Sequence, residues 1–134
     1  MRIRRIPVAT VAAACLAVAL SGCRSPVAPD DAWPEADKIR FPLGDIRPDG
    51  LRGPPDGLTA VAFEFCVPAD ARVYRKLRRI DPGLDIQPGA SGRIGCRAGQ
   101  SLVIGETGHP GWRGTLKALS KLDYVGEIRE CHFE

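Results

Sequence analysis

Cysteine and histidine are the side chains of this 134-residue chain that could bind a metal ion or carry redox chemistry. Cys131 and His132 are adjacent near the end of the sequence, and His109 lies in the stretch GETGHPG, close to Glu106. Thiolate, imidazole and carboxylate groups suit zinc or copper. The spacing weakens this hypothesis, because adjacent strand residues point to opposite faces and no C-x-x-C or H-x-x-x-H pattern occurs. A metal or thiol-redox site at Cys131, His109 and His132 is therefore the alternative hypothesis for this chain, beside that of a binding or structural protein. We expect no cofactor.

Nucleophilic catalysis is the second kind of chemistry to consider. A cysteine nucleophile needs a histidine within hydrogen-bond reach and a third group that orients this base. Nothing in the spacing of the cysteines and histidines specifies such an arrangement. The glycines of GETGHPGW could hold an anion before a helix, but the stretch lacks the lysine and the spacing of a phosphate loop. We therefore interpret it as a turn and expect no catalysis by this chain.

A cluster of cations is the third candidate. It consists of Arg72, Arg75, Lys76 and Arg79. Their spacing of three or four residues places them on one side of a helix, opposite Val73, Leu77 and Ile80. A solvated helix face is the ordinary interpretation of this pattern. The functional alternative is attraction to an anionic membrane surface or to an acidic partner.

The beginning of the sequence has the pattern of a leader peptide. Three arginines within the first five residues precede the apolar stretch 6–20, which is followed by Ser21 and Gly22. A basic, then apolar, then small-residue order is typical of a secretory signal peptide. The apolar stretch of 15 residues contains Pro7, and a membrane-spanning helix needs about 20 residues. Residues 1–22 are therefore predicted to be a cleaved signal peptide.

The end of this leader, Leu20-Ser21-Gly22-Cys23, resembles the lipobox of bacterial lipoproteins. The resemblance implies cleavage before Cys23 and attachment of lipid to its thiol, which would anchor the protein to a membrane. In such lipoproteins an Asp after the cysteine often causes retention in the inner membrane, and here that position is Arg24. We expect a cell membrane or outer membrane location, with the domain facing the periplasm or the exterior. An ordinary secretory signal without lipid remains the alternative.

Removal of the leader changes the net charge. Residues 1–22 hold three of the 19 basic residues and none of the 16 acidic ones, so residues 23–134 hold 16 of each and are neutral. Affinity for nucleic acid depends on clustered cations that bind phosphates. We therefore expect no nucleic-acid partner. The expected partners are the membrane, through the lipid on Cys23, and an envelope protein.

The segment after Cys23 is rich in proline and glycine. Residues 24–57 contain seven prolines and four glycines, a composition that predicts an extended, disordered tether over 23–57. Such a tether could hold a domain as much as ~100 Å from the lipid. Its larger apolar side chains could instead lie on the domain surface, which would shorten this reach. They are Trp33, Ile39, Phe41, Leu43 and Ile46.

The folded domain is expected over residues 58–134. Hydrophobic periodicity and turn residues predict a strand over 59–67, a helix from Asp70 to Ile80, strands over 91–96 and 100–106, a helix from Pro110 through Leu119, and a strand over 124–133. The stretch LDIQ could begin the second strand earlier. This β-α-β-β-α-β order is the ferredoxin-like pattern, a small two-layer α+β sandwich with both helices on one face of a four-stranded antiparallel sheet. The other face of the sheet would then be open and is the expected contact surface for a partner. It would carry Glu64 and, if Cys66 also points to this side, Cys66.

The usual strand order of that pattern, 4-1-3-2, also predicts which cysteines meet. It brings Cys66 and Cys96 to one edge of the sheet, while His109, Cys131 and His132 gather at the opposite edge. We predict a Cys66–Cys96 disulfide in an oxidising compartment, which requires the turn between the second and third strands to fold over. Two unpaired thiols are the alternative. The leading hypothesis is a membrane-anchored cell-envelope lipoprotein with a non-catalytic binding or structural domain.

Overall fold

The computed structural model describes residues 33–133. In chain order the elements are η1 (Ala36–Lys38), β1 (Leu51–Arg52), β2 (Thr59–Ala60), β3 (Ala62–Pro68), α1 (Ala71–Ile80), β4 (Asp85–Pro88), β5 (Gln100–Glu106), α2 (Trp112–Ser120) and β6 (Arg129–Glu130). The predicted signal peptide and the lipidation site Cys23 lie outside the described residues.

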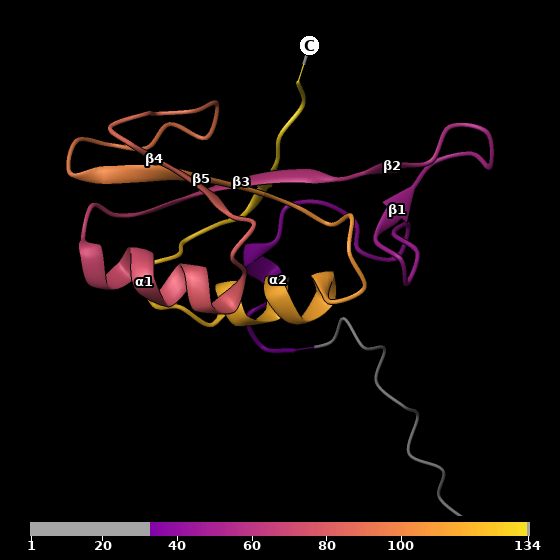
Figure 1. Ribbon diagram of the computed structural model, residues 1–134, viewed down its shortest axis with the longest axis horizontal. Coiled ribbons are helices and arrows are strands. Elements are labelled where there is room, and N and C mark those ends of the chain that lie inside the picture. Colours follow the sequence, from indigo (N-terminus) through magenta and orange to yellow (C-terminus); the bar gives the residue numbers. More distant parts are fainter. Residues whose placement is uncertain (1–32, 134) are drawn as a thin grey trace, which may run out of the picture.

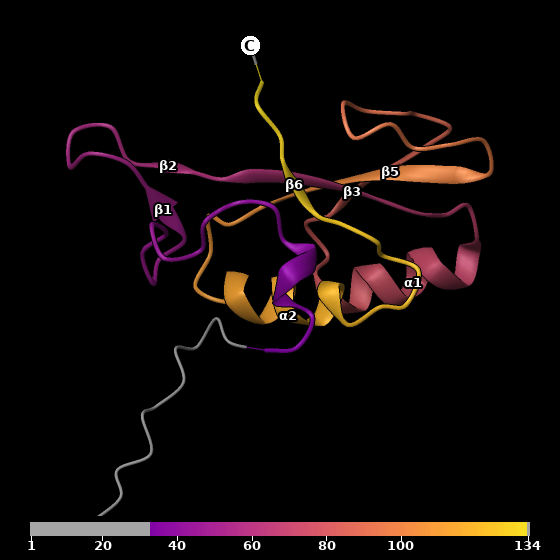
Figure 2. The same ribbon diagram turned by 180° about the vertical axis from the view of Figure 1, so that it is seen from behind.

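A four-stranded antiparallel sheet organises this part of the chain. Its strands lie in the order β4-β5-β3-β6. Both helices lie on the same face of the sheet (Figures 1 and 2). β1 and β2 form a second, two-stranded sheet beyond one end of β3 (Figure 1). The prediction of a small α+β domain with two helices and a four-stranded antiparallel sheet is confirmed.

The alternating pattern of β3 explains why the helices cover this face. Phe63, Phe65 and Val67 point toward the helices and are buried, and the rings of Phe63 and Phe65 stack with centroids 6.3 Å apart. The helices supply the other half of the core with Leu77, Trp112, Leu116 and Leu119. The alternating apolar side chains of the strand and those spaced three or four residues apart on the helices thus pack together in one apolar layer.

The first helix begins where the sequence predicts. The Asp70 carboxylate accepts hydrogen bonds from the backbone N–H groups of Arg72, at 2.7 Å, and Val73. This arrangement satisfies N–H groups that have no partner within the helix. The second helix begins at Trp112 and not at Pro110, because the residues between them form a turn in which the Trp112 N–H donates to the His109 carbonyl.

The predicted strand over 91–96 is wrong. This segment forms a turn over 92–95, in which Gly92 and Gly95 have φ of +62° and +82°, values that an extended strand does not adopt. The second strand of the sheet is β4, within the earlier stretch that contains LDIQ. The last strand is also shorter than predicted, because the Ile128 N–H donates to the Lys38 carbonyl and so pairs outside the sheet.

The prediction of a disordered tether is wrong over residues 33–57, which we call the N-terminal arm. Its five larger apolar side chains are buried in the core, each no more than 8% exposed: Trp33, Ile39, Phe41, Leu43 and Ile46. Figure 2 shows the arm, in purple, passing beside α2 and β6. The Trp33 indole N–H donates to the Ser120 hydroxyl at 2.9 Å. Composition did not reveal the arm because its apolar residues are widely spaced between prolines.

Candidate functional site

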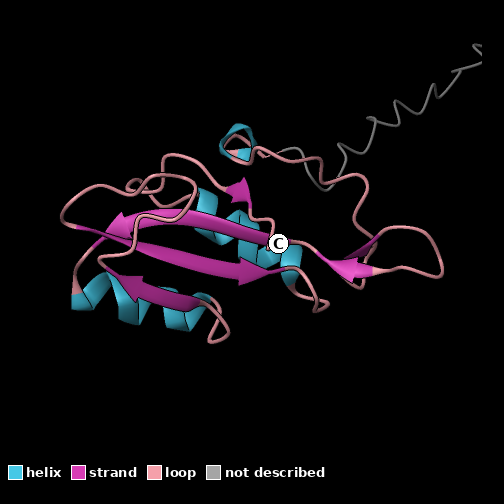
Figure 3. Ribbon diagram, turned by 90° about the horizontal axis from the view of Figure 1, so that it is seen from above, coloured by secondary structure: helices cyan, strands magenta, loops and turns pink. Residues whose placement is uncertain are grey.

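The face of the sheet away from the helices is partly covered by the connection between β4 and β5. We call residues 89–99 the covering loop. Figure 3 looks at this face from above and shows the loop passing over the strands, with the helices behind. The loop lies close enough to Leu102 that a Cβ on Gly92 would come within 2.6 Å of the leucine side chain. Glycine is therefore required for this approach.

A disulfide joins the covering loop to the sheet. Cys66 of β3 and Cys96 of the loop form the bond, with their Cα atoms 5.5 Å apart and a sequence separation of 30. The predicted pairing is confirmed, and the loop folds over the sheet as this pairing requires. A structural disulfide is compatible with an extracytoplasmic location.

Glu64 forms the second link between the sheet and the covering loop. Its side chain is only 2% exposed, and its Oε1 accepts a hydrogen bond from the Ile94 backbone N–H at 2.6 Å. The loop thereby satisfies a carboxylate that would otherwise lose its hydration on burial. The expectation that Glu64 and Cys66 form a contact surface is wrong, because the loop occupies that position.

The free cysteine lies at the margin of this covered face. Cys131 is half-buried and lines a shallow pocket of about 380 Å³ with Glu64, Arg93 and Phe133. Burial raises the pKa of the Cys131 thiol, and the negative charge of Glu64 raises it further, while Arg93 acts in the opposite direction. A thiol with a raised pKa stays protonated at neutral pH, so this site does not favour a reactive thiolate.

The two histidines do not join Cys131 in one site. His109 Nε2 lies 3.5 Å from Asp81 Oδ2, between the end of α1 and the start of α2. His132 Nδ1 lies 3.8 Å from Glu130 Oε1. Within residues 33–133 no group of three or more histidine, cysteine, aspartate or glutamate side chains is arranged to hold a metal ion. The topology placed these residues at one edge, but His109 lies on the helix side and Cys131 on the other.

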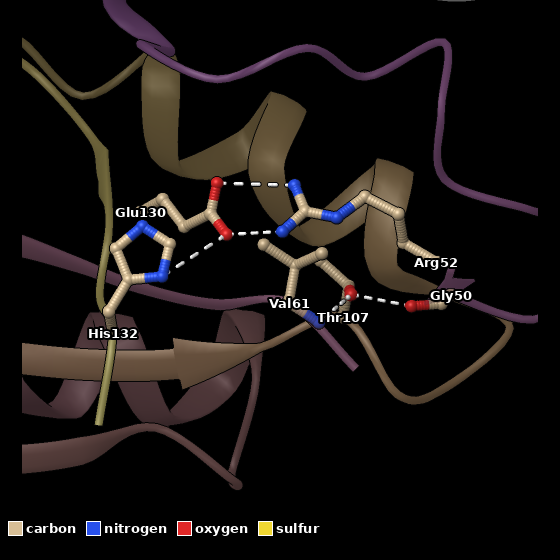
Figure 4. A network of polar contacts seen from close by, with 6 residues as sticks. All are labelled: Gly50, Arg52, Val61, Thr107, Glu130 and His132. Atoms are coloured by element: carbon tan, nitrogen blue, oxygen red, sulfur yellow. Dashed lines mark hydrogen bonds and ion pairs between the residues drawn. The ribbon is translucent and has the colours of Figure 1, made fainter. Parts of the chain in front are cut away.

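A polar network joins the N-terminal arm to the sheet (Figure 4). The Arg52 guanidinium donates two hydrogen bonds to the Glu130 carboxylate, and these bonds lower the pKa of Glu130. Nearby, the Thr107 hydroxyl donates to the Gly50 carbonyl at 2.6 Å and accepts from the Val61 N–H at 2.9 Å. Sequence analysis missed this network because it assigned Arg52 and Gly50 to the tether.

The predicted cation cluster is exposed as expected. Arg72, Arg75, Lys76 and Arg79 lie on the outer side of α1, and Arg78 adds a cation that the sequence analysis missed. Lys117 and Lys121 are exposed on α2 and just after it. We call these seven residues the basic helix face. None of the five cations on α1 forms an ion pair with an acidic side chain of residues 33–133.

Arginines elsewhere in the fold behave differently. Arg47 pairs with Asp49 at 2.9 Å, and Arg129 pairs with Glu127 at the same distance. Arg52 pairs with Glu130, as described above. Among residues 33–133, α1 carries five exposed cations for which no ion pair is found, and Arg93 and Arg97 of the covering loop are the other exposed arginines of this kind. The basic helix face, with the largest group of such cations, is therefore the strongest candidate for binding an external anion.

Comparison with protein-family models, with curated proteins and with solved structures gave no match. Over residues 33–133 neither helix has the length and apolar character needed to span a bilayer. The geometry of the covering loop, the free thiol and the basic helix face is thus the basis for a functional hypothesis.

Proposed function

We propose that this chain is a lipid-anchored lipoprotein of the cell envelope whose domain acts as a non-catalytic binding or structural module. The observation that carries the proposal is the Cys66–Cys96 disulfide in a chain whose leader ends in Leu20-Ser21-Gly22-Cys23. Disulfides persist in oxidising compartments, and the leader directs the chain to such a compartment. Cys23 would carry the lipid, and Arg24 favours the outer membrane where a host has two membranes.

The ferredoxin-like class is our assignment for the domain itself. It is supported by the spatial order β6-β3-β5-β4. When these strands are counted along the chain, this is the 4-1-3-2 order, with helices after the first and third strands. The N-terminal arm and the β1-β2 hairpin would be additions to this common plan.

A binding role accounts for the side chains better than catalysis does. The Cys131 thiol has a raised pKa, and His109 and His132 each face a carboxylate at separate positions. The competing hypothesis of a metal or thiol-redox protein using Cys131, His109 and His132 has less support for these reasons. The basic helix face, in contrast, offers exposed cations to an anionic partner.

Intact mass spectrometry tests the proposal. The protein is extracted from membranes of its native host and alkylated, once without reduction and once after reduction. We expect a chain that begins at Cys23 with added acyl chains. One thiol, that of Cys131, should be alkylated before reduction and three after it, because reduction releases Cys66 and Cys96.

Two outcomes would contradict the proposal. A mature chain without acyl groups would remove the lipid anchor, and three alkylated thiols before reduction would remove the disulfide. A Cys23→Ser variant serves as the control, since it should lose the acyl mass and leave the membrane fraction while keeping the Cys66–Cys96 bond. A Cys23→Ser variant that stays in the membrane would mean that another feature holds the protein there.

A further inference from the structure

Charge in this molecule is segregated between the helices and the rest of the chain. Residues 71–80 and 112–121, which cover both helices, hold eight lysines and arginines and no acidic residue. The remainder of residues 23–134 holds the other eight basic residues and all 16 acidic ones, a net charge of −8. The mature chain is neutral overall, but its two helices form a positive layer, and this gives its field a direction. Acidic residues that lie near this layer are Glu35 and Asp37, where η1 contacts α2, and Asp123 after α2.

The acidic residues at the ends of α1 do not neutralise this layer. Asp70 accepts hydrogen bonds from the backbone at the start of the helix. Asp81 accepts one from the Gly83 N–H at 2.8 Å and lies beside His109. Both carboxylates are thus used locally, and the exposed cations between them point to solvent over the length of the helix.

The described chain also begins on the helix side of the sheet. Trp33 is bonded to Ser120 of α2, and its ring lies 6.0 Å from the Lys117 ammonium nitrogen. In Figures 1 and 2 the indigo start of the arm lies beside the helices, away from the covering loop. The entry point of the chain and the positive layer are therefore on the same side of the molecule.

Chain length limits how far this side can be from a lipid on Cys23. Trp33 lies ten positions after Cys23 in the sequence, and a chain spans at most about 3.3–3.6 Å per residue. The two Cα atoms can be no more than about 36 Å apart. A disordered tether over 23–57 could reach ~100 Å. Because residues 33–57 are packed on the domain, the distance between Cys23 and the domain is limited to about a third of that length.

We propose that the basic helix face docks on an anionic phospholipid membrane, with the covering loop directed away from the bilayer. The inference rests on the proposed function, because the lipid on Cys23 is what holds the domain near the surface. Within that short reach, the positive layer can approach anionic headgroups to within the Debye length of about 8 Å at physiological salt. The short distance to the lipid on Cys23 and the positive charge both favour lipid phosphates as the binding partner of the basic helix face.

Vesicle sedimentation tests the contact without the anchor. The mature chain with Cys23→Ser is mixed with vesicles of phosphatidylglycerol and phosphatidylethanolamine, or with neutral phosphatidylcholine vesicles. We expect binding to the anionic vesicles that falls at least about tenfold between 50 and 500 mM salt. Because this assay does not use the lipid, its result is independent of the lipidation result above.

Two variants with equal charge change identify the contacting face. Arg75→Glu/Arg79→Glu reverses two cations on α1, and Arg93→Glu/Arg97→Glu reverses two exposed cations on the covering loop. We expect the α1 variant to lose at least about tenfold in affinity and the loop variant to lose far less. Thermal unfolding of both variants checks that the fold is retained, and Arg75→Gln/Arg79→Gln replaces the α1 variant if it unfolds.

The orientation is tested with the lipidated protein in the same anionic vesicles. Hydrogen exchange at the backbone amides of α1 should slow relative to neutral vesicles, while exchange in the covering loop stays unchanged. Equal loss of binding in both charge variants, equal binding to neutral vesicles, or protection of the covering loop instead of α1 would overturn the proposal. No vesicle binding at all would also overturn it and would leave a solvated helix face or an acidic protein partner as the interpretation of these cations.

Discussion

The two faces of the sheet are covered by different kinds of structure. On one face, apolar side chains of β3 and β5 pack against α1 and α2, and residues such as Phe65 and Val103 are completely buried. On the other face, the covering loop is attached by the Cys66–Cys96 disulfide and by the hydrogen bond from the Ile94 N–H to Glu64. One cover is held by apolar burial, and the other by a covalent bond and a buried carboxylate.

The composition of the covering loop explains this difference. Of its 11 residues, four are glycine, and Ile94 is the one large aliphatic side chain. Such a segment cannot bury enough apolar surface to offset the conformational entropy lost when it is ordered. A disulfide reduces this loss by restricting the unfolded chain. The comparison indicates that a glycine-rich loop can cover a sheet when specific bonds replace a hydrophobic face.

The largest effect is expected from breaking the helix-covered face with Phe65→Ala. Phe65 is 0% exposed, and truncation of a buried phenylalanine costs about 3–5 kcal/mol because a cavity remains. Urea unfolding monitored by circular dichroism measures the change. Ile104→Ala is the control, since Ile104 lies on the other face, opposite Glu64, and is half-exposed. A cost for Ile104→Ala equal to that of Phe65→Ala would contradict the difference between the two faces.

The next effect is expected from the double variant Cys66→Ser/Cys96→Ser. Loss of a cross-link between residues 30 apart in sequence destabilises by about 3–4 kcal/mol in the chain-entropy model. We expect the melting temperature to fall by at least about 10 °C, while the helices keep their circular dichroism signal at room temperature because the apolar core remains. An unchanged melting curve would mean that the disulfide does not stabilise the fold.

Trypsin shows whether this variant releases the covering loop. Arg93 and Arg97 are exposed within the loop, and cleavage after them requires the loop to leave the sheet. In the double variant we expect faster cleavage there than in the disulfide-bonded protein, with no matching increase after the cations of α1. Faster cleavage in α1 would indicate that the helix-covered face depends on the disulfide as well.

Sequence analysis predicted the helix-covered face well because its pattern is local. Alternation along β3 and the spacing of Val73, Leu77 and Ile80 both report which side of an element is buried. The Cys66–Cys96 pair was also predictable, because strand order and compartment limited the choices. These features need only a few neighbouring residues or one topological rule.

The remaining features depend on contacts between distant segments. Burial of the N-terminal arm requires grooves beside α2 that exist only after the domain has folded, as the bond between Trp33 and Ser120 illustrates. Residues 91–96, in the covering loop, were predicted to be one strand of a hairpin because the turn-forming stretch RAGQ follows them, but Gly92 and Gly95 have positive φ. The candidate residues were separated because His109 lies in the turn before α2, on the helix side of the sheet, whereas Cys131 follows β6 and lines the pocket on the other face.

A smaller effect is expected at Glu64, the polar link of the loop-covered face. Glu64→Ala leaves the Ile94 N–H without its acceptor, which costs about 1–3 kcal/mol for a buried donor. Glu64→Gln keeps an acceptor oxygen at the same reach and should cost less. Hydrogen exchange at the Ile94 amide separates the two, because it should accelerate in Glu64→Ala and much less in Glu64→Gln. Equal acceleration in both would mean that the negative charge, and not the acceptor, holds the loop.

The smallest effect is expected at the Arg52–Glu130 pair. This pair links the N-terminal arm to β6, and the arm is already packed on the domain through its buried apolar side chains. A partly exposed bidentate pair contributes up to about 1 kcal/mol. Because the pKa of Glu130 is lowered from 4.5 in the folded protein, the stability it contributes is present above about pH 4.5 and is lost as the pH falls through the folded pKa. His132 Nδ1 lies 3.8 Å from the same carboxylate, and its electrostatic interaction lowers the pKa of Glu130 in the same direction.

Arg52→Met should therefore lose stability at pH 7, and this loss should be smaller at pH 3, because the pH has then fallen toward the lowered pKa of Glu130. A double-mutant cycle with Glu130→Gln, measured by urea unfolding at both pH values, isolates the pair from the rest of the hairpin. A coupling above about 2 kcal/mol, beyond the range of exposed pairs, or one that does not weaken at pH 3, would contradict this. A coupling of that size would mean that the N-terminal arm, like the covering loop, depends on a specific bond in addition to its buried apolar side chains.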